Sequence, residues 1–406
     1  MSGLQDRGDE LDWLRAQVAE RLRTRRILDY RESAGWAGQA APVVDAIREI
    51  SEKAPSRPLA LLIQRAIDSL VKVILHADDS DGMIGELARD LLEIHPIVCD
   101  RADVLPAQLV RWMIRFSFDD QDFFVLDPVR YAHALGERGL TTLRGEVERR
   151  RDRGDPSFAV KYTIERLAVL DGDLDQIVKL LGGDLSRPHQ FIQIAEAMEE
   201  LGRDDLVLDW ALRGINVTEG WQVARLYDLA VAAHIRRGDA AGPLRLRLEQ
   251  HERMPSPATY DLLREAADPS RWEEMRAAAR ETLGSSDRGG LVDVLLADGE
   301  PDAAWALTVS DPVWDPGSQR WLRLAKAREA GSPADALTVY LRLADLALET
   351  TGRASYSRAI GLFRRARGAA KLAGSEEAFR LHLASLREQY RRRPAFMEML
   401  DRASLA

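Results

Sequence analysis

The sequence contains very little cysteine and has no long uninterrupted apolar run. Cys99 is the only thiol among 406 residues, so no intramolecular disulfide and no zinc site built from several thiolates can form. The most apolar stretch, residues 59–75, is broken by polar side chains and predicts a buried helix rather than a membrane span. The polar, acidic first residues also argue against a secretory signal. We therefore expect a cytoplasmic protein in a reducing compartment, without a membrane anchor.

Cationic charge is also in short supply. Asp and Glu (66) outnumber Lys and Arg (57), giving a net charge of -9. This balance does not suit a protein that coats nucleic acid or anionic lipid with its whole surface. Hydrophobic residues make up 46% of the chain and charged residues 30%, which is the range of globular proteins with a packed core. A chain of this length must divide its core between domains or extend it along a repeat array.

Apolar residues recur every three or four positions along almost the whole chain, whereas alternating, strand-like patterns are nearly absent. Leu11, Leu14, Val18 and Leu22 form one such stripe. This spacing predicts amphipathic helices. In the N-terminal third, irregular loops separate the predicted helices, which cover about residues 9–31, 40–53, 58–76, 84–95, 106–116, 128–138 and 140–152.

Two recurring patterns predict where helices begin and end. In the first, an Asp or Ser that can cap a helix precedes a proline, which suits the first turn. It occurs at Asp127, Asp155, Ser256, Asp268, Asp311, Asp315 and Ser332. In the second, a glycine that can end one helix precedes an acidic or capping residue that can begin the next. It occurs at Gly172, Gly202, Gly238, Gly299, Gly331 and Gly374.

Where these glycine corners are consecutive, they lie roughly 30 to 45 residues apart, which is the period of paired-helix repeats. We therefore predict an all-α fold, with a tetratricopeptide-like α-solenoid of helical hairpins over residues 155–406. An irregular N-terminal helical domain is predicted over residues 1–154. The charged run at residues 149–155 marks the boundary between them.

An acidic turn formed by Asp78, Asp79 and Asp81 ends at Gly82 and resembles a calcium loop at first sight. Aligning Gly82 with the sixth position of an EF-hand loop places Ala88 at the twelfth, where a carboxylate is required. The EF-hand interpretation therefore fails. We predict that Asp81 caps the following helix, and a divalent-ion or other functional role for the turn remains the alternative.

Two aromatic segments are candidates for binding a partner. The segment from residue 116 to residue 124 combines acids with aromatic rings, and it either presents a contact surface or folds its rings back onto the N-terminal core. A tryptophan in a later loop either packs on the next helix, beside Trp321, or is presented to a partner. The candidate partner-binding residues are Phe118, Asp119, Asp120, Asp122, Phe123 and Trp314.

Arginine clusters offer a route to nucleic acid, because phosphate binding needs several convergent cations. The possible phosphate contacts are Arg364, Arg365, Arg391, Arg392 and Arg393, and a further cluster lies between Arg21 and Arg31. The alternative is structural, since arginines near helix C-termini complement the helix dipole and neighbouring acids.

No catalytic signature accompanies these features. Nucleophile-elbow, dinucleotide-binding and kinase motifs are absent, and the seven histidines have no paired spacing for a metal. We predict that Cys99 is a buried, inert thiol rather than a nucleophile. The sequence thus predicts neither an enzyme nor a bound cofactor.

Several segments resemble the long helical region that follows the zinc finger in bacterial SWIM-finger proteins. The resemblance lies in residues 172–175, 194–203, 305–340 and 379–400, with residues 28–31 and 78–82 in the same pattern. It spans about residues 25 to 402. Because the finger needs several cysteines and this chain has one, the finger is absent and its contacts are not carried over.

Three functions follow as hypotheses. The first is a non-enzymatic protein-interaction module or adaptor of a bacterial multi-protein system, since paired-helix arrays expose an extended binding surface. The second is a nucleic-acid-associated accessory protein that uses the arginine clusters. The third is an enzyme with an unrecognised site at the acidic turn.

Overall fold

The computed structural model describes residues 2–405, and the side chains of residues 10–405. This part of the chain forms 21 α-helices and one 3-10 helix, and its only β pairing is an isolated bridge between Leu28 and Ala77. The predicted all-α fold is confirmed. No helix in the described part is both long enough and apolar enough to cross a bilayer.

The chain divides into two compact units, one ending at Leu229 and the other beginning at Ala230. The first contains α1 (Ser2–Arg21), α2 (Tyr30–Lys53), α3 (Arg57–Ile74), α4 (Met83–Arg101), α5 (Pro106–Phe118), η1 (Pro128–Tyr131), α6 (Ala132–Asp152), α7 (Phe158–Asp171), α8 (Leu174–Gly182), α9 (Pro188–Glu200) and α10 (Asp204–Val217). The division between the two units falls within helix α11 (Val223–Arg236). The second contains α12 (Ala241–Arg253), α13 (Pro257–Ala266), α14 (Pro269–Ser286), α15 (Arg288–Ala297), α16 (Pro301–Val309), α17 (Ser318–Arg328), α18 (Pro333–Glu349), α19 (Arg353–Leu372), α20 (Glu376–Gln389) and α21 (Pro394–Arg402).

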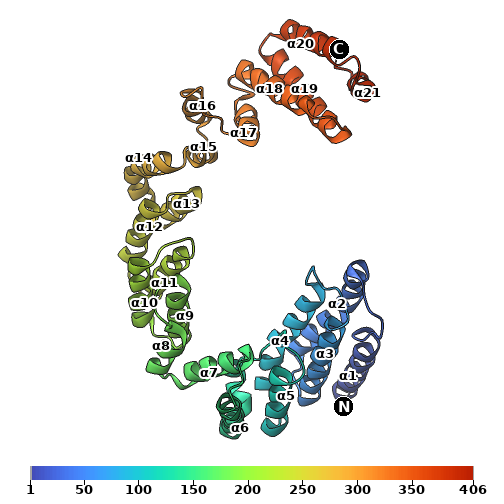
Figure 1. Ribbon diagram of the computed structural model, residues 1–406, viewed down its shortest axis with the longest axis vertical. Helices are drawn as coiled ribbons and strands as arrows, with labels where there is room; N and C mark the ends of the chain where they lie inside the picture. The colour runs from blue at the N-terminus through green and yellow to red at the C-terminus, as the bar shows by residue number, and fades with distance from the viewer. Residues whose placement is uncertain (1, 406) are drawn as a thin grey trace. The chain divides into compact units, whose positions relative to one another are not determined.

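Within each unit, helices pack on their close neighbours in the sequence, as Figure 1 shows for successive labels. Each described helix contact joins elements that are adjacent in the chain or separated by one or two others. This is the packing of a helical-repeat protein, in which each pair of helices buries its apolar face against the next pair. From α7 onward the helices follow one another as successive pairs. The predicted domain boundary near residue 154, between an irregular helical domain and a repeat array, stays a prediction.

The glycine corners lie between paired helices as predicted. Gly172, for example, ends α7 in the left-handed conformation (φ 65°), and the Asp173 carboxylate accepts a hydrogen bond from the Gln176 N–H (3.0 Å) at the start of α8. Gly202, Gly238, Gly299 and Gly374 also have positive φ, whereas Gly331, between α17 and α18, does not. Only glycine adopts this conformation without steric cost, so the glycine determines where the chain turns at these five corners.

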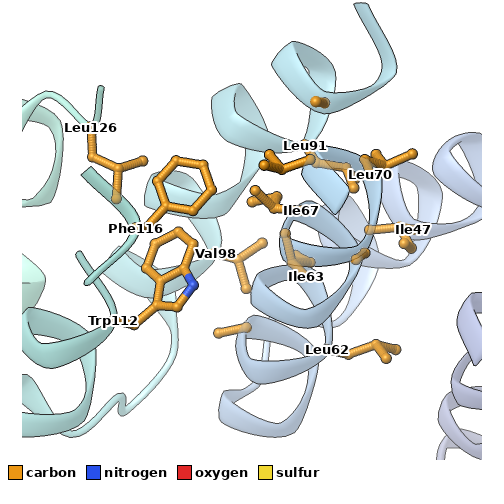
Figure 2. Packing of buried hydrophobic residues seen from close by; sticks show 14 of the residues in the cluster. Ile47, Leu62, Ile63, Ile67, Leu70, Leu91, Val98, Trp112, Phe116 and Leu126 are labelled. Atoms are coloured by element: carbon orange, nitrogen blue, oxygen red, sulfur yellow. The ribbon is translucent and has the colours of Figure 1, made fainter. Parts of the chain in front are cut away.

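The core of the first unit extends from α1 to α7, and Figure 2 shows a part of it, with labelled residues from α2, α3, α4 and α5 and from the loop that carries Leu126. Trp112 and Phe116 of α5 stack with their ring centroids 5.2 Å apart, and Leu126 packs against the same cluster. Ile63 and Ile67 of α3 are fully buried there. Each such side chain contributes roughly 1.5–3 kcal/mol through removal of apolar area from water. This core holds α3, α4 and α5 together.

The first predicted helix boundaries were wrong. Residues 9–31 do not form one helix: α1 ends at Arg21, and α2 already begins at Tyr30 instead of at residue 40. The reason is a capping box, in which the Asp29 side chain accepts hydrogen bonds from the N–H groups of Arg31 and Glu32. Helix α4 also continues through Pro96 to Arg101, because Val98 and Cys99 are buried and their packing offsets the lost hydrogen bond.

Candidate functional site

Three connections meet at one end of the first unit. They are the links from α1 to α2, from α3 to α4 and from α5 toward η1. The first two are joined by the isolated bridge, in which the Leu28 N–H donates to the His76 carbonyl (3.1 Å) and the Asp78 N–H donates to the Leu28 carbonyl (2.9 Å). Antiparallel packing of successive helices places alternate connections at the same end, so residues distant in sequence become neighbours.

Leu75 connects these links in space. It lines one shallow hollow with Ile27, Asp29 and Asp78, and a second hollow with Lys72, Phe116 and Asp120. The third connection also approaches the start of α4, where the Arg89 guanidinium lies 5.9 Å from the centre of the Phe124 ring. We call this region the hairpin-end surface. It consists of Ile27, Leu75, Asp78, Asp81, Met83, Asp120, Asp122 and Phe123.

Large apolar side chains are exposed at each of the three connections. Ile27 is 84% exposed, and Leu75 and Phe123 are each 51% exposed. Met83, at the start of α4, adds a fourth exposed apolar side chain. A single exposed apolar residue is ordinary, but several on neighbouring connections are typical of a surface that binds another molecule.

The acidic turn has a structural role that the sequence assigned to the wrong residue. The Asp79 carboxylate accepts hydrogen bonds from the N–H groups of Ile84 (2.9 Å) and Gly85 (2.8 Å), and so caps α4. Asp81, the predicted cap, reaches only the Met83 N–H, at 3.3 Å. Gly82 has a left-handed φ of 73° and reverses the chain, which brings Asp79 rather than Asp81 over the helix end.

Asp78 and Asp81 have no cationic partner among the described side chains. Asp78 is exposed and accepts hydrogen bonds from the N–H and hydroxyl groups of Ser80. Within the described residues, no group of three or more His, Cys, Asp or Glu side chains is placed to hold a metal ion.

Gln121, which sequence reasoning missed, organises the aromatic loop. Its buried amide nitrogen donates to the carbonyls of Phe116 (2.7 Å) and Phe124 (2.6 Å). Its amide oxygen accepts from the N–H groups of Phe123 (2.7 Å) and Phe124 (2.8 Å). One side chain thus forms four hydrogen bonds with backbone groups of the loop, which would otherwise need water as their partner. Nothing in the local pattern distinguishes Gln121 from a solvated polar residue.

The candidate residues of the loop divide into two groups. Phe118 packs against the core under the Arg150 guanidinium (4.9 Å), and Arg150 also pairs with Asp119 (2.7 Å). Asp120 pairs with Arg115 (2.8 Å) at the edge of the second hollow. Asp122 and Phe123 remain exposed. Phe118 therefore joins the core, as the structural alternative predicted, whereas Phe123 reaches the surface.

Trp314, in the link from α16 to α17, belongs to the second unit. It is half-buried in a cluster that includes Trp321. The Arg288 guanidinium lies 4.7 Å from its ring centre, so cation–π attraction holds the ring against α15. The tryptophan therefore packs on its neighbours as the structural alternative predicted, and the exposed large apolar residue of this link is Val313.

The predicted phosphate-binding arginines do not form a single free patch. Arg365 pairs with Glu329 (3.0 Å), and Arg391 pairs with Glu388 (2.8 Å). Arg393 donates to the Leu348 carbonyl (2.6 Å). Within the described part of the chain, only Arg364 and Arg392 of this set have no such partner, and they lie on different elements.

A buried polar cluster surrounds the single cysteine. The Cys99 sulfur lies 3.3 Å from His95 Nε2, and His95 Nδ1 lies 2.9 Å from the Tyr131 hydroxyl. Burial lowers the pKa of His95 to about 3 and raises the pKa of Cys99 to about 12. At neutral pH both groups are uncharged and out of contact with solvent, so the thiol is not an activated nucleophile. Sequence reasoning had overlooked His95, one helical turn before the cysteine.

Comparison with known proteins adds little to this description. No protein family and no curated protein matches the chain. A solved structure described as a "Circular tandem repeat protein with novel repeat topology and enhanced subunit contact surfaces" shares 14% identity, with 97% of this chain and 95% of that chain covered and a TM-score of 0.18. A score this low does not indicate a shared fold, so the helical-repeat assignment rests on this chain's own helices.

Proposed function

We propose that the protein is a non-enzymatic interaction module that binds a protein partner through the hairpin-end surface. The observation that supports this proposal is the exposure of Ile27, Leu75 and Phe123 on three alternate connections that the fold brings to one end of the first unit. Exposing apolar area to water is unfavourable, by roughly 25 cal/mol for each Å². A partner that covers these side chains recovers that free energy.

The polar groups nearby support binding rather than catalysis. Asp79 is used to cap α4, and Asp119 and Asp120 are paired with arginines. The buried Cys99 and His95 lie in the core instead of facing either hollow. General acid–base or nucleophilic chemistry needs a positioned group that reaches the substrate, and these groups do not.

The proposal extends to the setting of the protein. The corner motifs that resemble the helical region of bacterial SWIM-finger proteins support a role within a bacterial multi-protein system. The single cysteine supports a reducing, cytoplasmic location. We do not extend the proposal to nucleic acid, because the arginine candidates are mostly engaged with neighbouring acids and carbonyls.

Site-specific photo-crosslinking in native cells tests the proposal. A photoreactive phenylalanine analogue replaces Phe123, and a matched control places it at Leu381 of the second unit, which is 63% exposed. We expect a discrete protein adduct from position 123 and none from position 381. Equal adducts from both positions, or none from position 123, would contradict the assignment of the surface.

A further inference from the structure

We propose that the outer face of α1, α3 and α5 is a second binding surface, which takes an acidic, amphipathic segment of a protein partner. The inference goes beyond the proposed function, because this face runs along the helices and not across their ends. We call it the cationic face. It consists of Arg15, Arg23, Arg57, Leu61, Arg65, Lys72 and Arg111.

The three helices lie side by side, with α3 between α1 and α5 (Figure 1). Arg15 of α1 lines a hollow with Arg57 at the start of α3, and the Arg23 guanidinium, just beyond the end of α1, donates to the Ser69 hydroxyl near the end of α3 (3.4 Å). On the other side of α3, the Arg57 guanidinium donates to the Gln108 amide oxygen near the start of α5 (3.2 Å). Alternate helices of an antiparallel array share a direction, so their outward side chains form adjacent rows.

Five cations of this face have no acidic partner among the described side chains. Arg65 and Lys72 have no described partner of any kind. Arg57 and Arg23 reach only the neutral amide and hydroxyl groups just named, and Arg111 donates to a carbonyl of its own helix (2.9 Å). Their positive charge is therefore available to a partner.

The acids of the three helices do not offset this charge. Asp68 is the only acid of α3 and α5, and it pairs with an arginine of α5 (2.7 Å). On α1, Asp12 pairs with Arg15 (2.6 Å), and Glu10 lines a separate hollow against the end of α2. Glu20 lies about 140° around the helix from Arg15 and so points away from α3. Among the described side chains, no acid that faces α3 lacks a cationic partner.

Opposite charges mix only where the cationic face meets the hairpin-end surface. Asp120 lines a hollow with Lys72 but is paired with α5, and the acidic turn at Asp78 belongs to the link beyond the end of α3. Arg21 and Arg25, at the end of α1 and on the link that follows, are exposed and add further positive charge at this boundary. The excess of cations along the helices therefore attracts an anionic segment and repels a cationic one.

An apolar floor separates the cations of α3. Leu61 is half-buried, lies one turn from both Arg57 and Arg65, and lines the hollow against α1 together with Pro58 and Leu62. Arg57 and Arg65 are eight residues apart, which corresponds to about 12 Å along the helix. A partner helix that presents acids about two turns apart, with an apolar residue between them, complements this order.

The lining of the face favours a protein segment over a nucleic acid. Surfaces that bind single-stranded nucleic acid combine cations with exposed aromatic rings on which bases stack. The hollow between α1 and α3 is lined by arginines and aliphatic side chains, and the Phe116 ring in the neighbouring hollow is only 1% exposed. The arginine fork binds carboxylates with two parallel hydrogen bonds, and the aliphatic floor receives apolar side chains.

Fluorescence anisotropy with the full-length protein tests the inference. The probe is a labelled, amidated peptide of sequence LEELLEELLEELLEEL, compared with a shuffled peptide of the same composition and with an oligothymidylate of equal charge. We expect saturable binding of the first peptide that weakens with added salt, and at least about tenfold weaker binding of the other two probes. Equal binding of the shuffled peptide would show attraction to charge alone, and tighter binding of the oligothymidylate would assign the face to nucleic acid. Either result would overturn the inference.

Matched variants locate the binding. Arg65→Gln/Lys72→Gln removes two unpaired, solvent-facing cations of α3, whereas the control Arg364→Gln/Arg392→Gln removes the same charge from exposed positions of the second unit. We expect about fivefold weaker binding of the acidic peptide by the first variant, as the loss of two exposed ion pairs predicts, and less than about twofold by the control. Equal weakening by both variants would refute the site.

The two proposals can fail separately. Crosslinking from position 123 tests the hairpin-end surface and does not involve the cationic face. A discrete adduct at position 123 without binding of the acidic peptide would leave the interaction function standing and refute the cationic face. Binding of the peptide that depends on Arg65 and Lys72, without an adduct at position 123, would support the cationic face and contradict the assignment of the hairpin-end surface.

Discussion

The buried His95 makes the first unit sensitive to acid, and the magnitude follows from its surroundings. An unfolded histidine has a pKa of about 6.5, whereas burial lowers the pKa of folded His95 to about 3. Between these values the unfolded chain binds a proton that the folded protein does not. The free energy of unfolding is therefore not reduced by His95 above about pH 6.5, and it decreases as the pH falls from 6.5 toward 3.

The size of the effect can be worked out at pH 5. One pKa unit corresponds to about 1.36 kcal/mol, so a fall from pH 7 to pH 5 removes about 2 kcal/mol of unfolding free energy through this side chain. The corresponding decrease in amide protection is about 30-fold in α4 and α5, which pack around His95. Hydrogen–deuterium exchange, corrected for the intrinsic pH dependence of exchange, measures it.

A variant separates this histidine from the other titrating groups. His95→Gln removes this titration. Over the same pH range, amide protection in the variant should therefore lack the about 30-fold decrease that His95 causes in the natural protein. His133→Gln, at an exposed position that pairs with Asp100 (2.6 Å), is the control and should behave like the natural protein. If the natural protein and His95→Gln lose protection in parallel, the assignment to His95 is refuted.

Three further predictions concern the packing and the loops. Gly214→Ala should destabilise the first unit by about 1–3 kcal/mol in urea unfolding, because an added Cβ would lie 2.7 Å from the Phe191 side chain. Gly368→Ala should instead stabilise α19 by about 0.5–1 kcal/mol, because its Cβ would enter open space and alanine favours a helix more than glycine does. Asp79→Ala should cost about 0.5–2 kcal/mol through loss of the α4 cap, and Asp81→Ala should cost much less by the same measurement. Gln121→Leu should cost about 1–3 kcal/mol and speed limited proteolysis at the aromatic loop, because it leaves backbone groups unpaired; an unchanged cleavage rate would contradict its organising role.

Structural features that depend only on residues a few positions apart could be predicted from the sequence. Gly172 and Asp173 predicted a helix corner because a left-handed glycine and a capping acid act on the backbone immediately beside them. The same local logic failed at Asp81, since the left-handed turn at Gly82 brings Asp79 to the helix end instead. It also failed at Pro96, where tertiary packing maintains α4 beyond a residue that usually ends a helix.

The candidate surface was only partly predictable for a related reason. The sequence identified the acidic turn and the aromatic loop as separate candidates, but it could not show that both adjoin Leu75. It also could not show which ring of the loop would be buried, because the Arg150 guanidinium that covers Phe118 comes from α6.

The sequence by itself determined the helical class and the positions of the repeat corners, because apolar periodicity and glycine conformation act through neighbouring residues. Only the tertiary structure decided that Leu28 pairs with Ala77, that Gln121 holds the aromatic loop and that exposed apolar side chains gather at one end of the first unit. These contacts depend on how antiparallel helices align their ends, and that alignment is set by the packing of cores across segments far apart in the chain.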